Sequence, residues 1–108
     1  MSEISLGQFK EIELRVAKVL DVFEVEGADR LWKLLIDLGG QKKEIVAGIK
    51  KSYPREALLG KNIVVVNNLA PAVIRGVESR GMLLAARDGE ELALITTDRD
   101  VSAGSSVG

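Results

Sequence analysis

The sequence predicts a small all-β barrel of five strands, with a short helix between the third and fourth strands and short additions at both ends. Three observations predict this fold class. Apolar and polar residues alternate in several short runs, and glycine, proline and asparagine separate those runs. One internal stretch, Pro54 to Gly60, has the pattern of a short helix. A length of 108 residues suits one core, so we predict a single domain over residues 1–108.

The N-terminal quarter is predicted to contain a short helix and a long strand. Ser5 can cap a helix over Leu6 to Glu11. From Leu14 to about Glu26 the pattern changes to alternation, which is typical of a strand. The alternation slips in phase between Val19 and Phe23. This slip indicates a bulge or bend of the kind that small barrels need.

The second and third strands are predicted to form a hairpin. Leu31 to Leu38 follows a turn at residues 27–30 and alternates strictly, with Trp32 on the inward side. Two glycines at residues 39–40, followed by Lys42 and Lys43, indicate the hairpin connection. Glu44 to Gly48 is then the returning strand, and the predicted helix follows it.

The last strands are predicted on either side of a loop. Ile63 to Leu69 is apolar on both faces and ends before Pro71. After a loop over Ala70 to Gly81, Met82 to Ala86 is the fifth strand. A turn at residues 88–91 leads to another short strand that begins at Leu92. The tail from residue 98 is polar and small, and residues 103–106 are expected to form no regular element.

This order of elements is that of an OB-fold, a five-stranded Greek-key barrel. Ligands of OB-folds lie across the second and third strands and under the loops that join strands one to two and four to five. In this chain those loops are Gly27 to Arg30 and Ala70 to Gly81, and the face includes Lys33 and the tip with Lys42 and Lys43. Basic side chains therefore converge where an OB-fold binds its ligands.

The composition excludes several classes of function. The chain has no cysteine and no histidine, which removes disulfides, thiolate metal sites and the usual general base near neutral pH. We expect no catalytic residues, no cofactor and no metal site. No run approaches the ~20 apolar residues of a membrane span, and the N-terminus lacks the build of a secretory signal. We therefore expect a soluble, cytoplasmic protein without a membrane partner.

The net charge of -1 hides an uneven distribution. Residues 30–87 carry 11 basic and 4 acidic side chains, a net charge of +7. Residues 1–29 and residues 88–108 each contribute a net charge of -4. Folding can gather the basic middle segment into one patch, which favours an anionic partner. The alternative is a mixed, solvated surface that keeps the protein soluble.

These features favour a folded RNA as the ligand. The chain has only 4 aromatic residues, too few for the stacking platforms of single-strand binders, so phosphate contacts and shape readout fit better. Arg75 and Arg80 stand in a loop between two core strands, and a guanidinium matches phosphate geometry. Structural roles are the alternative for three others: a turn for Asn68, a loop hydrogen bond for Ser79, and core packing for Met82.

Several blocks of the sequence, taken in order, resemble a known family. The blocks are Ala28-Asp29-Arg30-Leu31, Lys33-Leu34-x-Ile36-Asp37-Leu38-Gly39, Ile45-Val46-Ala47-Gly48-Ile49, Leu59-Gly60-Lys61, Asn68-Leu69-x-Pro71 and Arg75-Gly76-x-x-Ser79-x-Gly81-Met82-Leu83-Leu84-Ala85-Ala86. From about Phe9 to Val101 the chain is similar to the tRNA-binding domain at the C-terminus of bacterial methionyl-tRNA synthetases. That domain also occurs as free-standing structure-specific tRNA-binding proteins and in endothelial monocyte-activating polypeptide-like proteins.

The resemblance implies an OB-fold, a homodimer formed by the N- and C-terminal additions, and binding to the outer corner of tRNA without regard to its sequence. It implies a noncatalytic module that is free-standing or an accessory (beta) part of methionyl-tRNA synthetase, with that enzyme as a candidate partner. By position it adds six residues to the binding face, and the OB-fold geometry supplies the other three. The predicted tRNA-binding residues are Arg30, Lys33, Lys42, Lys43, Asn68, Arg75, Ser79, Arg80 and Met82.

The chain departs from the family pattern at one place. After Pro71 the family commonly has basic residues, whereas this chain has Ala72 and Val73, which removes positive charge from the loop. A branch of the same family consists of export chaperones with a similar barrel and dimer. The alternative function is therefore a peptide-binding, chaperone-like dimer, for which residues 72–74 begin an apolar patch.

Overall fold

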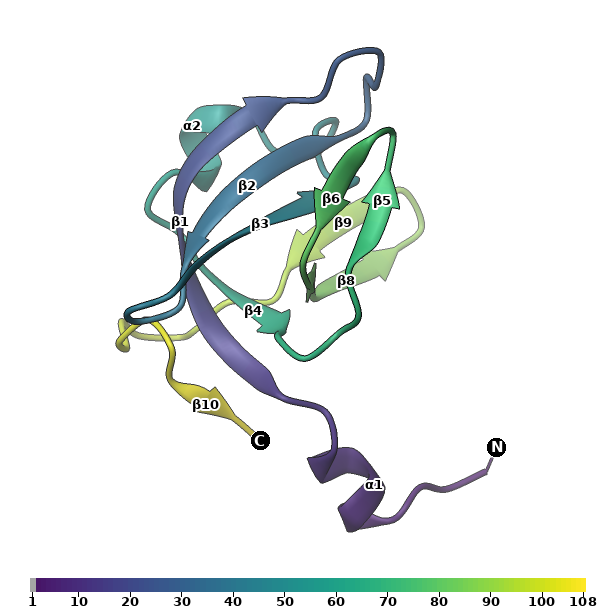
Figure 1. Cartoon of the computed structure of the whole chain (residues 1–108), viewed down its shortest axis with the longest axis vertical. Helices are drawn as coiled ribbons and strands as arrows, with labels where there is room; N and C mark the ends of the chain where they lie inside the picture. The colour runs from purple at the N-terminus through teal and green to yellow at the C-terminus, as the bar shows by residue number, and fades with distance from the viewer. Residues whose placement is uncertain (1) are drawn as a thin grey trace.

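The computed structural model describes residues 2–108, so Met1 of the predicted domain lies outside the described residues. Its main sheet is antiparallel and curled, with the strand order β3-β2-β1-β4-β7 (Figure 1). The strands of this path are β1 (Leu14–Glu24), β2 (Trp32–Asp37), β3 (Lys42–Ala47), β4 (Asn62–Val66) and β7 (Met82–Leu83). The predicted five-stranded OB-fold is confirmed, and the sheet has the form of a curled, OB-like half-barrel.

The remaining elements are two short helices, two hairpins and a C-terminal strand. The helices are α1 (Leu6–Lys10) and α2 (Arg55–Leu58), and α2 lies between β3 and β4 as predicted. The strands are β5 (Ala72–Ile74), β6 (Val77–Ser79), β8 (Ala85–Asp88), β9 (Glu91–Leu94) and β10 (Ser106–Val107). β5 pairs with β6 and β8 pairs with β9, each pair forming a separate two-stranded sheet.

β1 is the central strand of the half-barrel and pairs with a neighbour on each side. Its first part pairs with β4, from Leu14 to Lys18, and its second part pairs with β2, from Lys18 to Glu24. The register shifts between Val19 and Asp21, where one extra residue is accommodated. The predicted bend therefore lies in β1, and it lets one strand turn the corner between two neighbours.

The core lies on the concave side of this sheet. The strict alternation of β2 places Trp32, Leu34 and Ile36 inside, and all three are buried. The indole N–H of Trp32 donates a hydrogen bond of 2.8 Å to the carbonyl of Tyr53, which satisfies the polar edge of a buried ring. Leu58 of α2 is fully buried in the same cluster, so the short helix packs against the barrel through one leucine.

Three predicted strand boundaries are wrong. β3 begins at Lys42, so Lys42 and Lys43 belong to the strand and not to the turn. β4 ends at Val66 and not at Leu69. The predicted fifth strand is divided at Leu84 into β7, which pairs with β4, and β8, which pairs with β9. Each difference arises because pairing with a partner strand, rather than apolar composition, determines where a strand ends.

The C-terminal tail was predicted to be irregular, and this is wrong for Ser106. β10 pairs with Leu14 and Arg15 at the start of β1. Just before it, the N–H of Gly104 donates to the carbonyl of Val16 at 2.7 Å. The tail can lie this close to the barrel only with glycine at position 104, because a Cβ there would collide with the carbonyl oxygen of Leu38. The tail is thus a packed addition to the barrel.

The N-terminal addition is α1, which projects away from the barrel (Figure 1). Its capping box is complete: Gln8 N–H donates to the Ser5 hydroxyl, and Ser5 N–H donates to the Gln8 side chain. No residue of α1 is buried, and the Leu6 side chain is 67% exposed. Within residues 2–108, no helix has the length and apolar composition needed to cross a membrane.

Candidate nucleic-acid interface

The loop expected between residues 70 and 81 is a β-hairpin, not an irregular loop. β5 and β6 pair in register from Ala72 with Ser79 to Ile74 with Val77. The two residues of the turn, Arg75 and Gly76, have φ angles of 52° and 79°. Positive φ at both central positions is the geometry that tight hairpins favour. The hairpin therefore fixes the backbone of Arg75 at its tip.

The base of this hairpin is held against β3. The backbone N–H of Arg80 donates to the carbonyl of Glu44 at 3.0 Å. The Ser79 hydroxyl accepts from the N–H of Val46 at 2.9 Å and donates to the carbonyl of Gly81 at 3.1 Å. Ser79 is 3% exposed, so its hydroxyl connects two backbone segments and does not face solvent. The hydroxyl therefore joins β3 to the base of the hairpin, and a direct contact of Ser79 with RNA stays a prediction.

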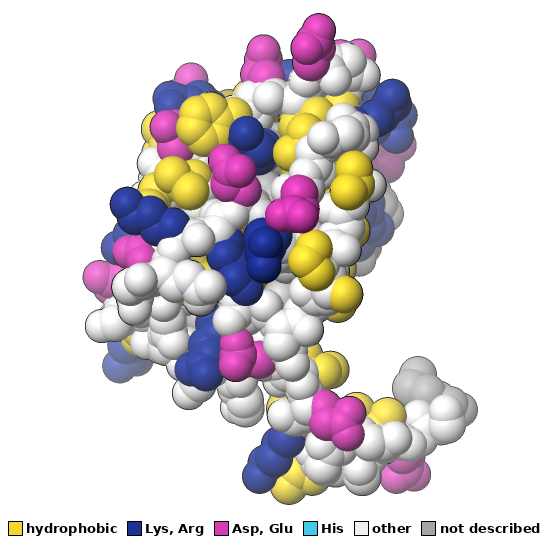
Figure 2. Space-filling view, viewed as in Figure 1, with side chains coloured by type: hydrophobic (Ala, Val, Ile, Leu, Met, Phe, Trp, Pro, Cys, Tyr) yellow, Lys and Arg dark blue, Asp and Glu magenta, His cyan; other side chains and the backbone are white. Residues whose placement is uncertain are grey.

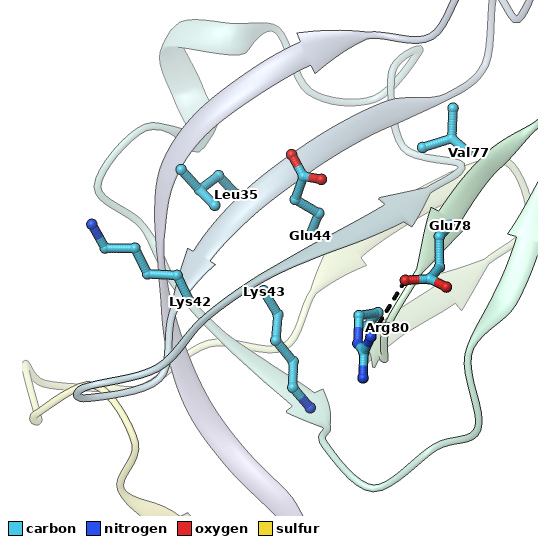
Figure 3. Close-up of a pocket in the computed structure, with 7 residues that line it drawn as sticks. All are labelled: Leu35, Lys42, Lys43, Glu44, Val77, Glu78 and Arg80. Atoms are coloured by element: carbon cyan, nitrogen blue, oxygen red, sulfur yellow. Dashed lines mark hydrogen bonds and ion pairs between the residues drawn. The ribbon is translucent and has the colours of Figure 1, made fainter.

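Three of the predicted cations lie around one hollow of about 280 Å³, which we call the Arg80 hollow (Figure 3). Its lining residues are Leu35, Lys42, Lys43, Glu44, Val77, Glu78 and Arg80. Arg80 is 3.5 Å from Glu78 in an exposed ion pair, and such pairs contribute little and break readily. Figure 2 shows Lys and Arg side chains together in the middle of this face, with carboxylates beside them. The hollow is a mixed but net basic surface.

Hydrogen bonds through Asn67 connect Lys43 to Glu13 in the N-terminal part of the chain. Its ammonium donates to the carbonyl and the side-chain oxygen of Asn67 at 3.0 and 2.7 Å, which leaves one of its three N–H donors available. The side-chain amide of Asn67 in turn donates to a carboxylate oxygen of Glu13. This hydrogen bond is the main reason why the pKa of Glu13 lies below its ordinary value.

Two predicted contact residues, Asn68 and Lys33, already interact with other groups of the protein. Asn68 accepts from the N–H of Glu13 at 2.8 Å and donates to the carbonyl of Glu11 at 2.7 Å. Its side chain therefore holds the segment between α1 and β1. Lys33 is 3.5 Å from Glu44, and its ammonium lies 5.2 Å from the ring centroid of Phe23. Lys33 is close to the Arg80 hollow, but its charge is partly compensated by Glu44.

The remaining predicted residues lie around a second group of hollows. Arg30 and Arg75 line a hollow between the β1–β2 turn and the hairpin tip, together with Asp29. Met82 is 48% exposed and lines a mostly apolar hollow beside β3 and β8. The β1–β2 turn and the hairpin tip thus lie side by side, and six of the nine predicted residues are divided between two groups of hollows.

Sequence reasoning missed two cations in this second group of hollows. Arg87 of β8 lines both the apolar hollow and a neighbouring one, and Lys51 lines that neighbour. From the sequence, both count only among the 11 basic residues of positions 30–87, because Arg87 follows the predicted fifth strand and Lys51 precedes the predicted helix. The division at Leu84 redirects β8 and brings Arg87 to the surface beside Arg30. No motif in the sequence signals that division.

A scan against protein families matches residues 14–106 to a model described as "Putative tRNA binding domain". The chain belongs to this family. Over 107 residues it is 46% identical to the methionine–tRNA ligase of Pyrococcus furiosus, which covers 99% of this chain but only 15% of that enzyme. The chain therefore corresponds to a small part of the ligases that it matches, and the family match concerns that part.

Solved structures of related proteins have the same fold. A methionyl-tRNA-synthetase-related protein of Pyrococcus horikoshii superposes with a TM-score of 0.94 at 32% identity, over 100% of both chains. The chaperone CsaA of Picrophilus torridus superposes with a TM-score of 0.90 at 28% identity, over 98% of this chain and 100% of the other. The structural neighbours thus include a protein related to methionyl-tRNA synthetase and a chaperone. Among residues 2–108, no group of three or more potential ligands could hold a metal ion.

Proposed function

We propose that this tRNA-binding domain recognises the folded shape of tRNA through phosphate contacts on the hairpin β5–β6 and the strands beside it. The observation that carries the proposal is the paired hairpin β5–β6, which has cations from several elements beside both of its ends. Lys42, Lys43 and Arg80 lie at its base, and Arg30 and Arg75 lie at its tip. Met82 is a further contact, whereas Asn68 and Ser79 hold the surface in place. The domain supplies no catalytic group and acts noncatalytically in the cytoplasm, free-standing or as an accessory part of methionyl-tRNA synthetase.

The number of cations sets the salt dependence. If five groups each neutralise one phosphate, the slope of log affinity against log salt is about -3.5 to -4.5, at roughly 0.7 to 0.9 per contact. Shape recognition requires a folded partner, so a single-stranded RNA of equal length offers the same charge without the same spacing. We therefore expect tRNA to bind more tightly than unstructured RNA at every salt concentration.

The experiment is a fluorescence-anisotropy titration of labelled tRNA at several salt concentrations. Arg80→Ala is expected to weaken binding and to reduce the slope by roughly 0.7 to 0.9. Arg99→Ala is the matched control, because Arg99 is highly exposed and lines neither group of hollows. Equal binding of tRNA and single-stranded RNA, or equal slopes for Arg80→Ala and Arg99→Ala, would contradict the proposed mode of recognition.

We also propose that two copies pair through the terminal additions. Ile4, Leu6 and Ile12, in and beside α1, are 64%, 67% and 44% exposed, an unusual set of apolar side chains on a projecting helix. A dimer would cover them and place two tRNA surfaces on one particle, which increases avidity.

Light scattering after size exclusion should give twice the monomer mass, and Leu6→Glu should reduce the measured mass to that of one copy. Val73→Glu, which charges an equally exposed apolar residue on the hairpin, should leave the dimer intact.

The second candidate function is that of a peptide-binding chaperone. Two observations favour it: the structural likeness to CsaA and the mostly apolar hollow lined by Met82. This function requires the domain to suppress aggregation of an unfolded client at a concentration similar to that of the client. Suppression without any binding of tRNA would replace the first proposal by this one.

A further inference from the structure

Three hollows join into one continuous surface beside the tip of the hairpin: the apolar hollow at Met82, the hollow at Lys51 and Glu90, which we call the Arg87 hollow, and the hollow at the hairpin tip. The apolar hollow, of about 490 Å³, shares Gly48, Arg87 and Leu92 with the Arg87 hollow. The hollow at the hairpin tip shares Ile74 with the apolar hollow and Arg30 with the Arg87 hollow. A ligand in the apolar hollow is therefore within reach of the groups that line the other two.

The floor of the apolar hollow is built from aliphatic and thioether side chains. It is lined by Ile74, Met82, Leu83, Leu84, Ala85 and Leu92 in addition to the end of β3. Met82 is about half exposed, and a methionine adapts its shape to a flat ring more readily than a branched side chain does. The volume lies in the usual range of small-ligand sites, roughly 300 to 1,000 Å³.

The rim of the joined surface carries four cations: Arg30, Lys51, Arg75 and Arg87. All four are exposed. Within residues 2–108 none of them forms an ion pair or a side-chain hydrogen bond, whereas Lys33, Lys50, Arg55 and Arg80 each have a carboxylate partner.

Two carboxylates, Asp29 and Glu90, also line the rim, so its net charge is positive by two. The rim cations are thus available to an anionic ligand without breaking a contact.

We propose that this surface takes one unpaired nucleotide of the bound RNA, with the base on the apolar floor and the adjoining phosphates on Arg87, Arg30 and Lys51. The proposal rests on the proposed function, because the nucleotide belongs to the same tRNA. Unpaired bases in RNA loops are often turned outward and packed against side chains, including guanidinium planes. A peptide strand fits less well, because the free edge of β5 is only three residues long and follows Pro71.

Two variants test the floor and the rim separately. Ala85→Leu fills the apolar hollow without changing any charge, and Ala86→Leu is its matched control, because Ala86 is also exposed on the same strand but does not line the hollow. Arg87→Ala removes one rim cation, with Arg99→Ala as its control. Urea unfolding of each variant establishes that its stability is within the range of the wild type.

In the tRNA titration, Ala85→Leu is expected to weaken binding, because the larger side chain occupies the space that the base would take in the apolar hollow. Arg87→Ala is expected to weaken binding and to reduce the salt slope by roughly 0.7 to 0.9. In methyl-labelled wild-type protein, tRNA should shift the resonances of Ile74, Leu83 and Leu92, because an aromatic base moves nearby methyl signals. This third measurement requires no variant.

The outcomes separate this inference from the function on which it rests. If the wild type does not bind tRNA, both fail. If Arg80→Ala weakens tRNA binding while Ala85→Leu and Arg87→Ala behave like their controls, and the methyl signals stay in place, the nucleotide site is wrong and the tRNA function remains. If Ala85→Leu abolishes suppression of client aggregation but not tRNA binding, the hollow is a peptide site.

Discussion

The positioning role of Ser79 can be tested by removing its hydroxyl. In Ser79→Ala the N–H of Val46 and the carbonyl of Gly81 lose their partner at 2.9 and 3.1 Å. Val46 and Ser79 are buried, so water does not replace the lost acceptor. A buried donor without a partner costs about 1–3 kcal/mol of unfolding free energy. At roughly 4–8 °C per kcal/mol for a domain of this size, the Tm falls by about 4 °C or more.

The assay is urea unfolding at 25 °C, followed by the fluorescence of Trp32. The midpoint should fall for Ser79→Ala while the slope of free energy against urea stays the same, because the unfolded surface does not change. Ser52→Ala is the matched control, since Ser52 is exposed and its side chain makes no hydrogen bond among residues 2–108. We expect the control to stay within about 0.5 kcal/mol of the wild type.

The opposite pattern would refute the reasoning. If Ser79→Ala unfolds at the same urea concentration as the wild type, the two hydrogen bonds do not hold the hairpin. If its affinity for tRNA then falls tenfold at unchanged stability, Ser79 contacts the RNA directly, as the family resemblance implied. A combined loss of stability and a smaller loss of affinity is the result expected of a positioning residue.

Three further predictions concern the additions and the carboxylates. Gly104→Ala should lower the unfolding free energy by more than 1 kcal/mol, because its Cβ would collide with the carbonyl of Leu38; unchanged urea unfolding would contradict this. Asn68→Ala should increase hydrogen exchange throughout α1 while the core strands keep their protection, because the amide joins the α1–β1 segment to the end of β4. Hydrogen bonds from Asn67 and from the Val22 N–H lower the pKa of Glu13 and Asp21, respectively. A lowered carboxyl pKa stabilises the fold above the unfolded-state value, so stability should fall as pH decreases below about 4.5, and a flat profile between pH 5 and 3 would contradict the assignment.

Local patterns were sufficient to predict the barrel. The alternation of β2 places Trp32, Leu34 and Ile36 on one side because successive side chains of a strand point to opposite faces. The slip in phase after Val19 marked the bend of β1, because an extra residue changes which face follows. These features depend on neighbours in the sequence and can be seen without knowing what the strands pack against.

The hairpin β5–β6 was harder to predict. Each of its strands has three residues, and its turn is Arg75-Gly76 rather than the more common Asn-Gly or Asp-Gly. What stabilises the hairpin is contact with β3, through Ser79 and the backbone of Arg80. A segment that is ordered by a distant strand carries little signal of its own.

In the candidate site, too, local patterns predicted some features and long-range contacts decided the others. The charge distribution and the family blocks selected the candidate residues, and six of the nine lie exposed or partly exposed beside a hollow. They could not show that Ser79 is buried, that Asn68 is occupied by Glu11 and Glu13, or that Arg87 lies near Arg30. Each of these facts depends on which long-range partners meet after folding.

The sequence by itself determined the OB-like fold class, the inward faces and the excess of basic residues between positions 30 and 87, because the order of elements, short-range periodicity and composition are visible without knowing the long-range partners. The tertiary structure alone decided which cations are free. Lys33 and Arg80 have carboxylates within 4 Å, while Arg30, Arg75 and Arg87 have none among the described residues. The physical reason is that an ion pair requires two groups to meet in space, and the fold brings those groups together from strands far apart in the chain.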